Sequence, residues 1–348
     1  MSRFLSTLLV LGLILSFSAS QLCSNALAKG RTLRQVATSK HFLIGSAGSI
    51  WKFTPDGSYQ NTLSTQFNML TPENELKWFA TEPQQGKFDF YWGDKIVAFA
   101  QQNNMRIHGH TLVWFDSLPA WVKNGTFTRD ELIAVMKNHI QTVVSHYKGK
   151  IQEWDVVNEA IEHHGNGLRD NIFLRVIGPE YIAMAFQFAH EADPDAVLFY
   201  NDFGTENWPI KSDFQYNLLK GLLKQGVPVN AVGLQMHEYS DNPIPVDRYR
   251  KELQRLGSLG LRVGVTEFDA SSKEPQKNPL AMRLGVQAQT YANAVSACRA
   301  VSACKSFTIW GVNDKTTHQS DLAPVIFDAN NQPKPAYTSV LRTVLRSK

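Results

Sequence analysis

The sequence predicts a single-domain (β/α)8 barrel. Apolar, strand-like runs alternate with helix-like segments, which is the pattern of βα units around a parallel sheet. Eight such runs cover residues 42–47, 67–71, 105–114, 151–157, 196–200, 231–235, 261–267 and 306–310. A doubly wound open sheet is the competing architecture, but the early segment Gly45-Ser46-Ala47-Gly48 does not match the glycine-rich phosphate turn of that fold.

The segments between these runs carry helix signals. They cover residues 91–102, 129–146, 179–192, 213–224, 246–256 and 281–301. Thr128 and Glu131 have the spacing of a capping box, which predicts a helix start. Pro179 suits the first turn of the next helix, and Asp193-Pro194 is its expected stop. Each helix therefore fits as the return from one strand to the next.

The first 28 residues have the features of a secretory signal peptide. Arg3 precedes an apolar run at 4–17, and Ala26-Leu27-Ala28 matches a small-residue cleavage site. The run is too short to span a membrane. We therefore expect a secreted protein, extracellular or periplasmic, whose residues 29–348 form one domain with no membrane segment.

The net charge and the cysteine content limit the expected binding partners and indicate the redox environment of the protein. The formal net charge is +4, too small and too dispersed to indicate nucleic-acid binding. Cys23 falls within the predicted signal peptide. In a secreted protein, Cys298 and Cys304 are candidates for a local disulfide, with two buried free thiols as the alternative.

Two of the predicted strands end in a glutamate. The segment 151–160 is apolar on both faces and closes with Asn158-Glu159, and the segment 262–270 reaches Glu267 and Asp269. Strands of a barrel deliver such residues to one rim, at their carboxyl ends. Paired carboxyl groups can protonate a glycosidic oxygen and attack the sugar carbon, and in retaining enzymes they lie about 5 Å apart. We therefore expect Glu159 and Glu267 to face each other across one cavity.

Other polar and aromatic residues occur at the same strand ends. They are Glu73, Asn74, His110, Trp114, Asn158, Asn201, Asp202, Gln235, His237, Trp310 and Asp314. Indole rings can stack on the C–H faces of a pyranose, and amides and carboxylates can bind its hydroxyls. Lys77, just beyond the second strand, can donate to a sugar hydroxyl. The predicted rim therefore suits a carbohydrate.

Competing chemistries have weaker support. The sequence has no H-E-x-x-H pattern, and His163-His164 is expected on a loop, so we predict no metal site. A G-x-S-x-G elbow is also missing from the sequence, which disfavours a serine hydrolase. The predicted reaction needs no metal or organic cofactor.

Ordered motifs across the predicted mature chain resemble one family. They are LTPENELKW (70–78), GHTLVW (109–114), WDVVNEA (154–160), GPEYIAMAFQFAHEADPDAVLFYND (178–202), VGLQMH (232–237), VTEFD (265–269), WGVND (310–314) and PKPAY (333–337). In these motifs the sequence is similar to the glycoside hydrolase family 10 endo-β-1,4-xylanases. The resemblance implies a (β/α)8 fold and retaining hydrolysis of β-1,4 bonds in xylan. Its expected partner is a polysaccharide substrate, and we expect a monomer.

The resemblance also implies a role for each matched residue. Glu159 would be the acid/base and Glu267 the nucleophile, while Asn158 would bind the sugar 2-hydroxyl. His237 and Asp269, with Gln235 nearby, would orient the nucleophile and keep it ionised. The glycone-side contacts would be Glu73, Asn74, Lys77, His110 and Trp114, and Trp310 would lie under the reacting sugar.

The sequence departs from the family pattern on the substrate side. Phe115 and Ser117 stand where the family usually has histidine and glutamine, Phe203 replaces a tyrosine, and His318 replaces an aromatic residue. The altered contacts leave open hydrolysis of another β-linked glycan, or transglycosylation. A non-catalytic glycan-binding barrel is the alternative from another class, but it would have no use for a paired acid and nucleophile.

Overall fold

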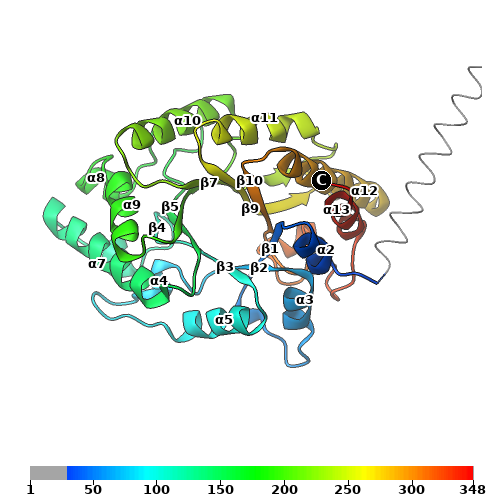
Figure 1. Cartoon of the computed structure of the whole chain (residues 1–348), viewed down its shortest axis with the longest axis horizontal. Coiled ribbons are helices and arrows are strands. Elements are labelled where there is room, and N and C mark those ends of the chain that lie inside the picture. Colours follow the sequence, from blue (N-terminus) through cyan, green and yellow to red (C-terminus); the bar gives the residue numbers. More distant parts are fainter. Residues whose placement is uncertain (1–29, 348) are drawn as a thin grey trace, which may run out of the picture.

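Eight parallel strands close into a barrel with helices around it (Figure 1). The computed structural model describes residues 30–347, so the predicted signal peptide lies outside them. In ring order the strands are β1 (Leu43–Gly48), β2 (Met69–Pro72), β3 (Arg106–Gly109), β5 (Glu153–Asn158), β6 (Val197–Asp202), β7 (Ala231–Leu234), β9 (Arg262–Ser271) and β10 (Cys304–Ile309). Because β10 pairs with both β9 and β1, the ring is closed and the predicted fold is confirmed.

Two short strands extend the barrel wall at its carboxyl end. β8 (His237–Tyr239) pairs with the end of β9, and β4 (Val113–Trp114) pairs with the end of β5. The prediction of one continuous strand at 105–114 was wrong, because β3 ends at Gly109 and residues 110–112 separate it from β4. In β4, Trp114 lies opposite Asn158, at the mouth of the barrel.

Most of the helices lie between successive strands, while α2 precedes β1 and α13 follows β10. They are α2 (Leu33–Ser39), α3 (Ser58–Gln66), α4 (Trp78–Thr81), α5 (Tyr91–Gln102), α6 (Ala120–Lys123), α7 (Arg129–Tyr147), α8 (Ile172–Val176), α9 (Tyr181–Ala192), α10 (Pro209–Lys224), α11 (Val246–Gly257), α12 (Leu280–Ala300) and α13 (Pro335–Arg346), with single 3-10 turns at η1 (Ile50–Lys52) and η2 (Ser320–Leu322). None of the helices in the described part of the chain has both the length and the apolar character needed to cross a membrane.

Most of the expected helix boundaries hold. The capping box of Thr128 and Glu131 is formed at the start of α7. The expected start at residue 213 was wrong, because α10 begins at Pro209, whose ring fits the first helical turn. Similarly, α9 begins at Tyr181, two residues after the expected Pro179.

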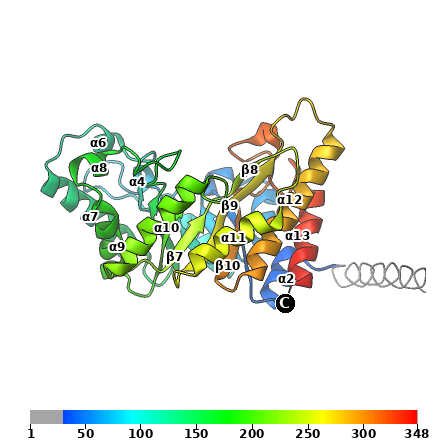
Figure 2. The ribbon, with the colours of Figure 1, turned by 90° about the horizontal axis from the view of Figure 1, so that it is seen from above.

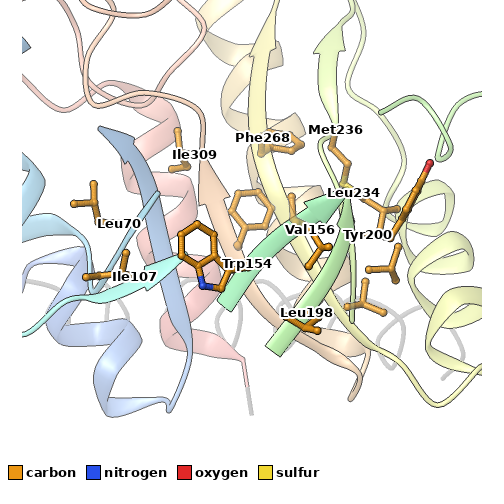
Figure 3. Close-up of a cluster of buried hydrophobic side chains, with 14 of the residues drawn as sticks. Leu70, Ile107, Trp154, Val156, Leu198, Tyr200, Leu234, Met236, Phe268 and Ile309 are labelled. Carbon is orange, nitrogen blue, oxygen red and sulfur yellow. The ribbon is translucent and has the colours of Figure 1, made fainter. Parts of the chain in front are cut away.

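Successive side chains of β5 point to opposite sides of the barrel wall. Outward-facing residues pack against helices: Trp154, for example, lies 6.2 Å from Tyr147 of α7, measured between ring centroids. Figure 3 shows part of this buried apolar layer. Glu153 and Asp155 instead hydrogen-bond His108, on neighbouring β3, inside the barrel. The interpretation of this strand as apolar on both faces was therefore wrong.

A disulfide closes a short loop near the end of the domain, and a hydrogen bond joins that end to the start. Cys298 in α12 and Cys304 in β10 form a disulfide, with their Cα atoms 5.3 Å apart. Lys40 Nζ, just after α2, donates to the Ser347 carbonyl just after α13, at 2.7 Å. Figure 2 shows α2 and α13 side by side with the C-terminus next to them. The first and last helices of the described chain are therefore neighbours.

Candidate active site

A polar cavity opens at the carboxyl ends of the strands. Its empty volume, including the open mouth, is about 830 Å³. Its lining comprises Glu73, Asn74, Lys77, His110, Trp114, Asn158, Glu159, Phe203, Gln235, His237, Glu267, Trp310 and His318. Every residue predicted to be catalytic or substrate-binding is therefore found in one cavity, although their roles stay predictions at this point. Asp269 lies behind this lining and is buried.

Glu159 occupies the turn that follows β5. Its backbone has a φ of 55°, in the left-handed region that costs a non-glycine residue about 1 kcal/mol or more. The turn is held on both sides, because the Glu159 N–H donates to the Asn201 carbonyl at 2.8 Å. Arg169 Nε donates to the Glu159 carbonyl at 3.0 Å. These two bonds fix the direction in which the carboxyl group leaves the strand.

The surroundings of Glu159 favour its protonated form. Burial raises the pKa of this carboxyl, and the negative charges of Asp202 and Glu267 raise it further. Gln235 Nε2 donates to Glu159 Oε1 at 3.0 Å, which partly opposes the rise in pKa. The net result is a carboxyl group suited to donate a proton.

The surroundings of Glu267 have the opposite effect. Burial alone would raise the pKa of this carboxyl, but a hydrogen bond from His237 and the positive charges of His110 and His237 outweigh it, so the pKa is lowered. Asn201 Nδ2 also donates to Glu267 Oε1 at 2.7 Å. The cavity therefore contains one carboxyl group that favours its proton and one that favours its charge.

His237 lies between two carboxylates. Its Nε2 is 3.3 Å from Glu267 Oε2, and its Nδ1 is 3.1 Å from Asp269 Oδ2. Burial would lower the pKa of His237, but the charges of Asp269 and Glu267 raise it well above its ordinary value. The resulting imidazolium offsets the charge of Glu267, which agrees with the supporting position predicted for Asp269.

Three amides connect the two glutamates. Asn158 Oδ1 accepts hydrogen bonds from Asn201 Nδ2 at 3.0 Å and from Gln235 Nε2 at 3.3 Å. The same two donors reach Glu267 and Glu159, respectively. Because the Asn158 oxygen is occupied, its amide nitrogen is the end that can donate to a bound molecule.

Lys77 lies on the opposite wall of the cavity. Only 9% of it is exposed, so it is not a surface lysine. Its Nζ donates to Asn74 Oδ1 at 3.0 Å and lies 5.0 Å from the ring centroid of Trp114. Burial lowers the pKa of Lys77, while the charges of Glu267 and Glu73 oppose that shift. This wall therefore offers hydrogen-bond donors beside an indole ring.

A chain of buried charged groups runs through the barrel interior beneath the cavity. Of its members, only His110 was predicted from the sequence. From the cavity downward it consists of His110, Asp155, His108 and Glu153, with Arg106 and Arg262 at the far end. Asp155 accepts from His110 Nδ1 and from His108 Nε2, each at 2.8 Å. Burial would lower the pKa of His108, but Asp155 and Glu153 raise it to about 10. The spacing of His108 and His110 by two residues was an available signal, because it places both on one strand face.

A second group supports Glu159 from behind, and only its Asp202 was named from the sequence. Asp202 and Lys211 form a fully buried ion pair at 2.8 Å. Tyr200 OH also donates to Asp202 at 2.6 Å. Asp202 was expected at the rim, and it is the last residue of β6. Its side chain does not line the cavity, but its negative charge raises the pKa of Glu159 through space.

The departures from the family pattern lie close to these supports. The Arg169 guanidinium lies 4.4 Å from the ring centroid of Phe115, and the Lys211 ammonium lies 3.5 Å from that of Phe203. His318 lines the cavity, and its ring centroid is 6.0 Å from that of His237. Asp314, expected at the rim, does not line the cavity, and its carboxylate pairs with Lys334 at 2.9 Å.

One group of side chains in the described residues has donor types that metals use. Atoms of His110, Asp155 and Glu267 lie within 4.8 Å of one another. However, both Asp155 oxygens accept hydrogen bonds from histidines, and Glu267 binds Asn201 and His237. These donors are already matched by protein partners, which fits a hydrogen-bonded charge network better than a metal centre.

The fold and the site together define a class of protein. A parallel (β/α)8 barrel with two carboxyl groups of opposite pKa shift in a strand-end cavity has the architecture of a glycoside hydrolase. The family described as Glycosyl hydrolase family 10 matches residues 32–343. The chain belongs to this family.

Individual relatives agree over nearly the whole chain. Endo-1,4-beta-xylanase B of Thermotoga neapolitana is 35% identical, with 96% of this chain and 94% of that protein covered. Beta-1,4-xylanase of Dictyoglomus thermophilum is 38% identical, with 97% and 98% covered. The crystal structure of xylanase 10B from Thermotoga petrophila in complex with xylobiose superposes with a TM-score of 0.87 at 37% identity, covering 91% of this chain and 98% of that one.

Proposed function

We propose that this protein is an endo-β-1,4-xylanase that hydrolyses xylan by double displacement with retention of configuration. The observation that carries the proposal is the pair of carboxyls in one cavity, with the pKa of Glu159 raised and that of Glu267 lowered. Relatives named as xylanases supply the substrate class. The separation of about 5 Å typical of retaining enzymes stays a prediction for this pair.

In the first step, a Glu267 oxygen attacks the anomeric carbon and the bond to the leaving sugar breaks. Glu159 transfers its proton to the departing oxygen, so the leaving sugar departs neutral and a glycosyl ester remains on Glu267. The hydrogen bond from Asn201 to Glu267 orients the attacking carboxylate. The Asn158 amide nitrogen binds the sugar 2-hydroxyl, where such a bond strengthens as positive charge develops.

In the second step, Glu159, now ionised, takes a proton from water. The resulting hydroxide attacks the anomeric carbon from the side that the leaving group vacated, and the ester bond to Glu267 breaks. Two inversions give net retention. His237 stabilises the carboxylate that is released, because it holds a positive charge 3.3 Å away.

The remaining cavity residues bind the sugar chain. Glu73, Asn74, Lys77, His110 and Trp114 are proposed as glycone-side contacts, and Trp310 as the platform under the reacting sugar. Support comes from their presence in one cavity, with a buried lysine beside an indole. Aromatic faces stack on sugar C–H groups while the polar groups bind the hydroxyls.

Azide rescue tests the two catalytic assignments. In Glu267→Ala, azide is expected to replace the nucleophile and to give an α-glycosyl azide from an activated aryl β-xylobioside. In Glu159→Ala, azide is expected to attack the glycosyl ester and to give a β-glycosyl azide. Product configuration is read by proton NMR. Full hydrolytic activity in either variant would reject the assignment of that residue.

A substrate panel tests the sugar preference, since Phe115, Phe203 and His318 alter the substrate side. Reducing ends released from xylan, cellulose and mannan are measured, together with the ratio of transfer to hydrolysis products. Release from xylan alone is expected. Preferential release from cellulose or mannan would replace xylan as the proposed substrate. Binding to a glycan without release of reducing ends from any of them would support the non-catalytic barrel.

We also propose that the mature chain is secreted after removal of residues 1–28 and acts as a monomer. The disulfide between Cys298 and Cys304 supports an oxidising compartment. N-terminal sequencing of protein from the culture fluid tests the cleavage site. Light scattering tests the oligomeric state, and a stable dimer would contradict the second part.

A further inference from the structure

Three large aromatic side chains are exposed together at the surface. Trp51 in η1 is 47% exposed, and Tyr91 and Trp92 at the start of α5 are 56% and 41% exposed. Single exposed aromatic residues are common in soluble proteins, but a contiguous group of them usually marks a binding surface. We call these three residues the aromatic platform.

The rings of the aromatic platform contact one another edge to face. The centroids of Trp51 and Trp92 are 6.4 Å apart at 79°, and those of Tyr91 and Trp92 are 4.8 Å apart at 77°. Lys95 Nζ donates to Tyr91 OH at 2.6 Å and lies 5.2 Å from the Trp92 ring centroid. Lys95 Nζ also lies 4.2 Å from the Tyr91 ring centroid, so these contacts hold the rings in place, while the exposed part of each ring stays open to a ligand.

The aromatic platform lies on the same face of the barrel as the cavity. Trp51 follows the carboxyl end of β1, and Tyr91 begins α5, which runs back between β2 and β3 on the outside of the barrel (Figure 1). Helices of a (β/α)8 barrel begin on the face where the strands end. Lys52, next to Trp51, pairs with Glu73 at 2.5 Å, and Glu73 lines the cavity. The aromatic platform therefore continues outward from the Glu73 side of the cavity.

We propose that the aromatic platform binds sugar units of a β-1,4-linked glycan chain that extends from the cavity beyond Glu73. This inference rests on the proposed function, because it assumes that the cavity holds part of the same polymer. The C–H faces of successive pyranoses stack on the exposed rings, and the Lys95 ammonium and indole N–H groups donate to hydroxyls. The ligand is a polymer and not a short sugar, because some of its sugar units fill the cavity while further units of the same chain reach the aromatic platform.

The test compares a double variant, Trp51→Ala with Trp92→Ala, against the parent protein on two substrates. On soluble polymeric xylan the apparent KM is expected to rise roughly threefold to tenfold with kcat unchanged, because only remote binding is lost. On 4-nitrophenyl β-xylobioside, which fills the cavity alone, both constants are expected to stay at the parent values. A variant with Trp51→Phe and Trp92→Tyr is expected to restore the polymer KM.

Leu280→Ala is the matched control, because Leu280 is an exposed apolar residue at the start of α12 on the same barrel face. It is expected to leave both substrates unaffected. Parent-like kinetics of the double variant on the polymer would overturn the inference. So would a change of oligomeric state with an unchanged polymer KM, since the platform would then be an interface between copies.

Binding measured without turnover separates this inference from the proposed function. In affinity electrophoresis through gels containing xylan, with Glu267→Ala added to every protein to prevent cleavage, the double variant is expected to migrate faster than the parent and than Leu280→Ala. A parent protein that cleaves neither substrate would reject the proposed function, while this binding difference would still support the aromatic platform. Equal migration of all three proteins would reject the platform whatever the activity.

Discussion

Asn201 Nδ2 donates a hydrogen bond of 2.7 Å to Glu267 Oε1. Thr266 Oγ1 donates to Asn201 Oδ1, also at 2.7 Å, so the amide presents its nitrogen to the carboxylate. The same nitrogen reaches Asn158 Oδ1 at 3.0 Å. One side chain thus orients both the proposed nucleophile and the amide of Asn158, which is proposed to bind the substrate.

Replacing Asn201 with aspartate is expected to reduce activity most strongly at low pH. Asn201→Asp removes the hydrogen bond to Glu267 and places a second carboxyl beside it, so the pKa of Glu267 rises. Loss of a hydrogen bond to a charged group costs about 1.5–3 kcal/mol, so kcat is expected to fall roughly tenfold to a hundredfold. The measurement is the pH profile of kcat/KM, and an unshifted acidic limb would contradict the assignment.

Activity of the parent protein is expected to follow a bell-shaped pH profile. The lowered pKa of Glu267 means that its active, ionised form is lost only as pH falls through that lowered pKa. The raised pKa of Glu159 means that its active, protonated form persists until pH rises through that raised pKa. In Glu159→Gln, assayed with a dinitrophenyl glycoside that needs no acid, the alkaline limb is expected to disappear. Glu162→Gln, which changes a carboxylate outside the cavity, should keep both limbs.

Removing Arg169 is expected to slow the reaction more than it weakens binding. Arg169 donates to the Glu159 and Ile161 carbonyls, and thereby holds the left-handed turn that directs the acid. In Arg169→Ala, kcat is expected to fall about tenfold to a hundredfold, because small misplacements of a catalytic group are costly. Steady-state kinetics on an aryl xylobioside measure this. Arg175→Ala, which removes an exposed arginine paired with Asp170, should leave kcat unchanged, and equal losses in both variants would argue for a general effect.

The buried pair of Lys211 and Asp202 gives a stability prediction. Lys211→Met leaves the Asp202 carboxylate buried without its counter-charge, which is expected to lower the free energy of unfolding by about 3–5 kcal/mol. Arg129→Met breaks the surface pair with Glu180 and should cost less than about 1 kcal/mol. Urea unfolding followed by tryptophan fluorescence compares the two variants. Similar urea midpoints for the two variants would show that the buried pair of Lys211 and Asp202 contributes no more to stability than the surface pair.

The barrel was predictable because its strands are short apolar runs that alternate with helix-like segments. α3 was not predicted, since only Tyr59, Thr62 and Leu63 are buried in a mostly polar helix whose periodicity is weak. α13 was also not predicted, although its buried Val340, Leu341 and Val344 follow a helical period that was available in the sequence. The first of these helices depends on tertiary packing, whereas the second could have been found.

The cavity lining was predictable because parallel strands deliver their carboxyl ends to one rim. The interior charge network was not, because it depends on strand register. His108 meets Glu153 only because β3 and β5 pair with these two residues opposite each other, across 45 positions of sequence. A sequence pattern shows which face a side chain occupies, but it does not show which partner lies across the sheet.

The hydrogen bond from Lys40 to the Ser347 carbonyl has a practical consequence. It joins the residues that follow α2 and α13 beside the amino ends of the strands, away from the cavity mouth. A carrier protein, a resin or a second module attached at residue 348 would therefore contact the face with the amino ends of the strands. The cavity at their carboxyl ends would stay accessible. Coupling through the loops after β1 or β9 would instead obstruct the path of a long polymer.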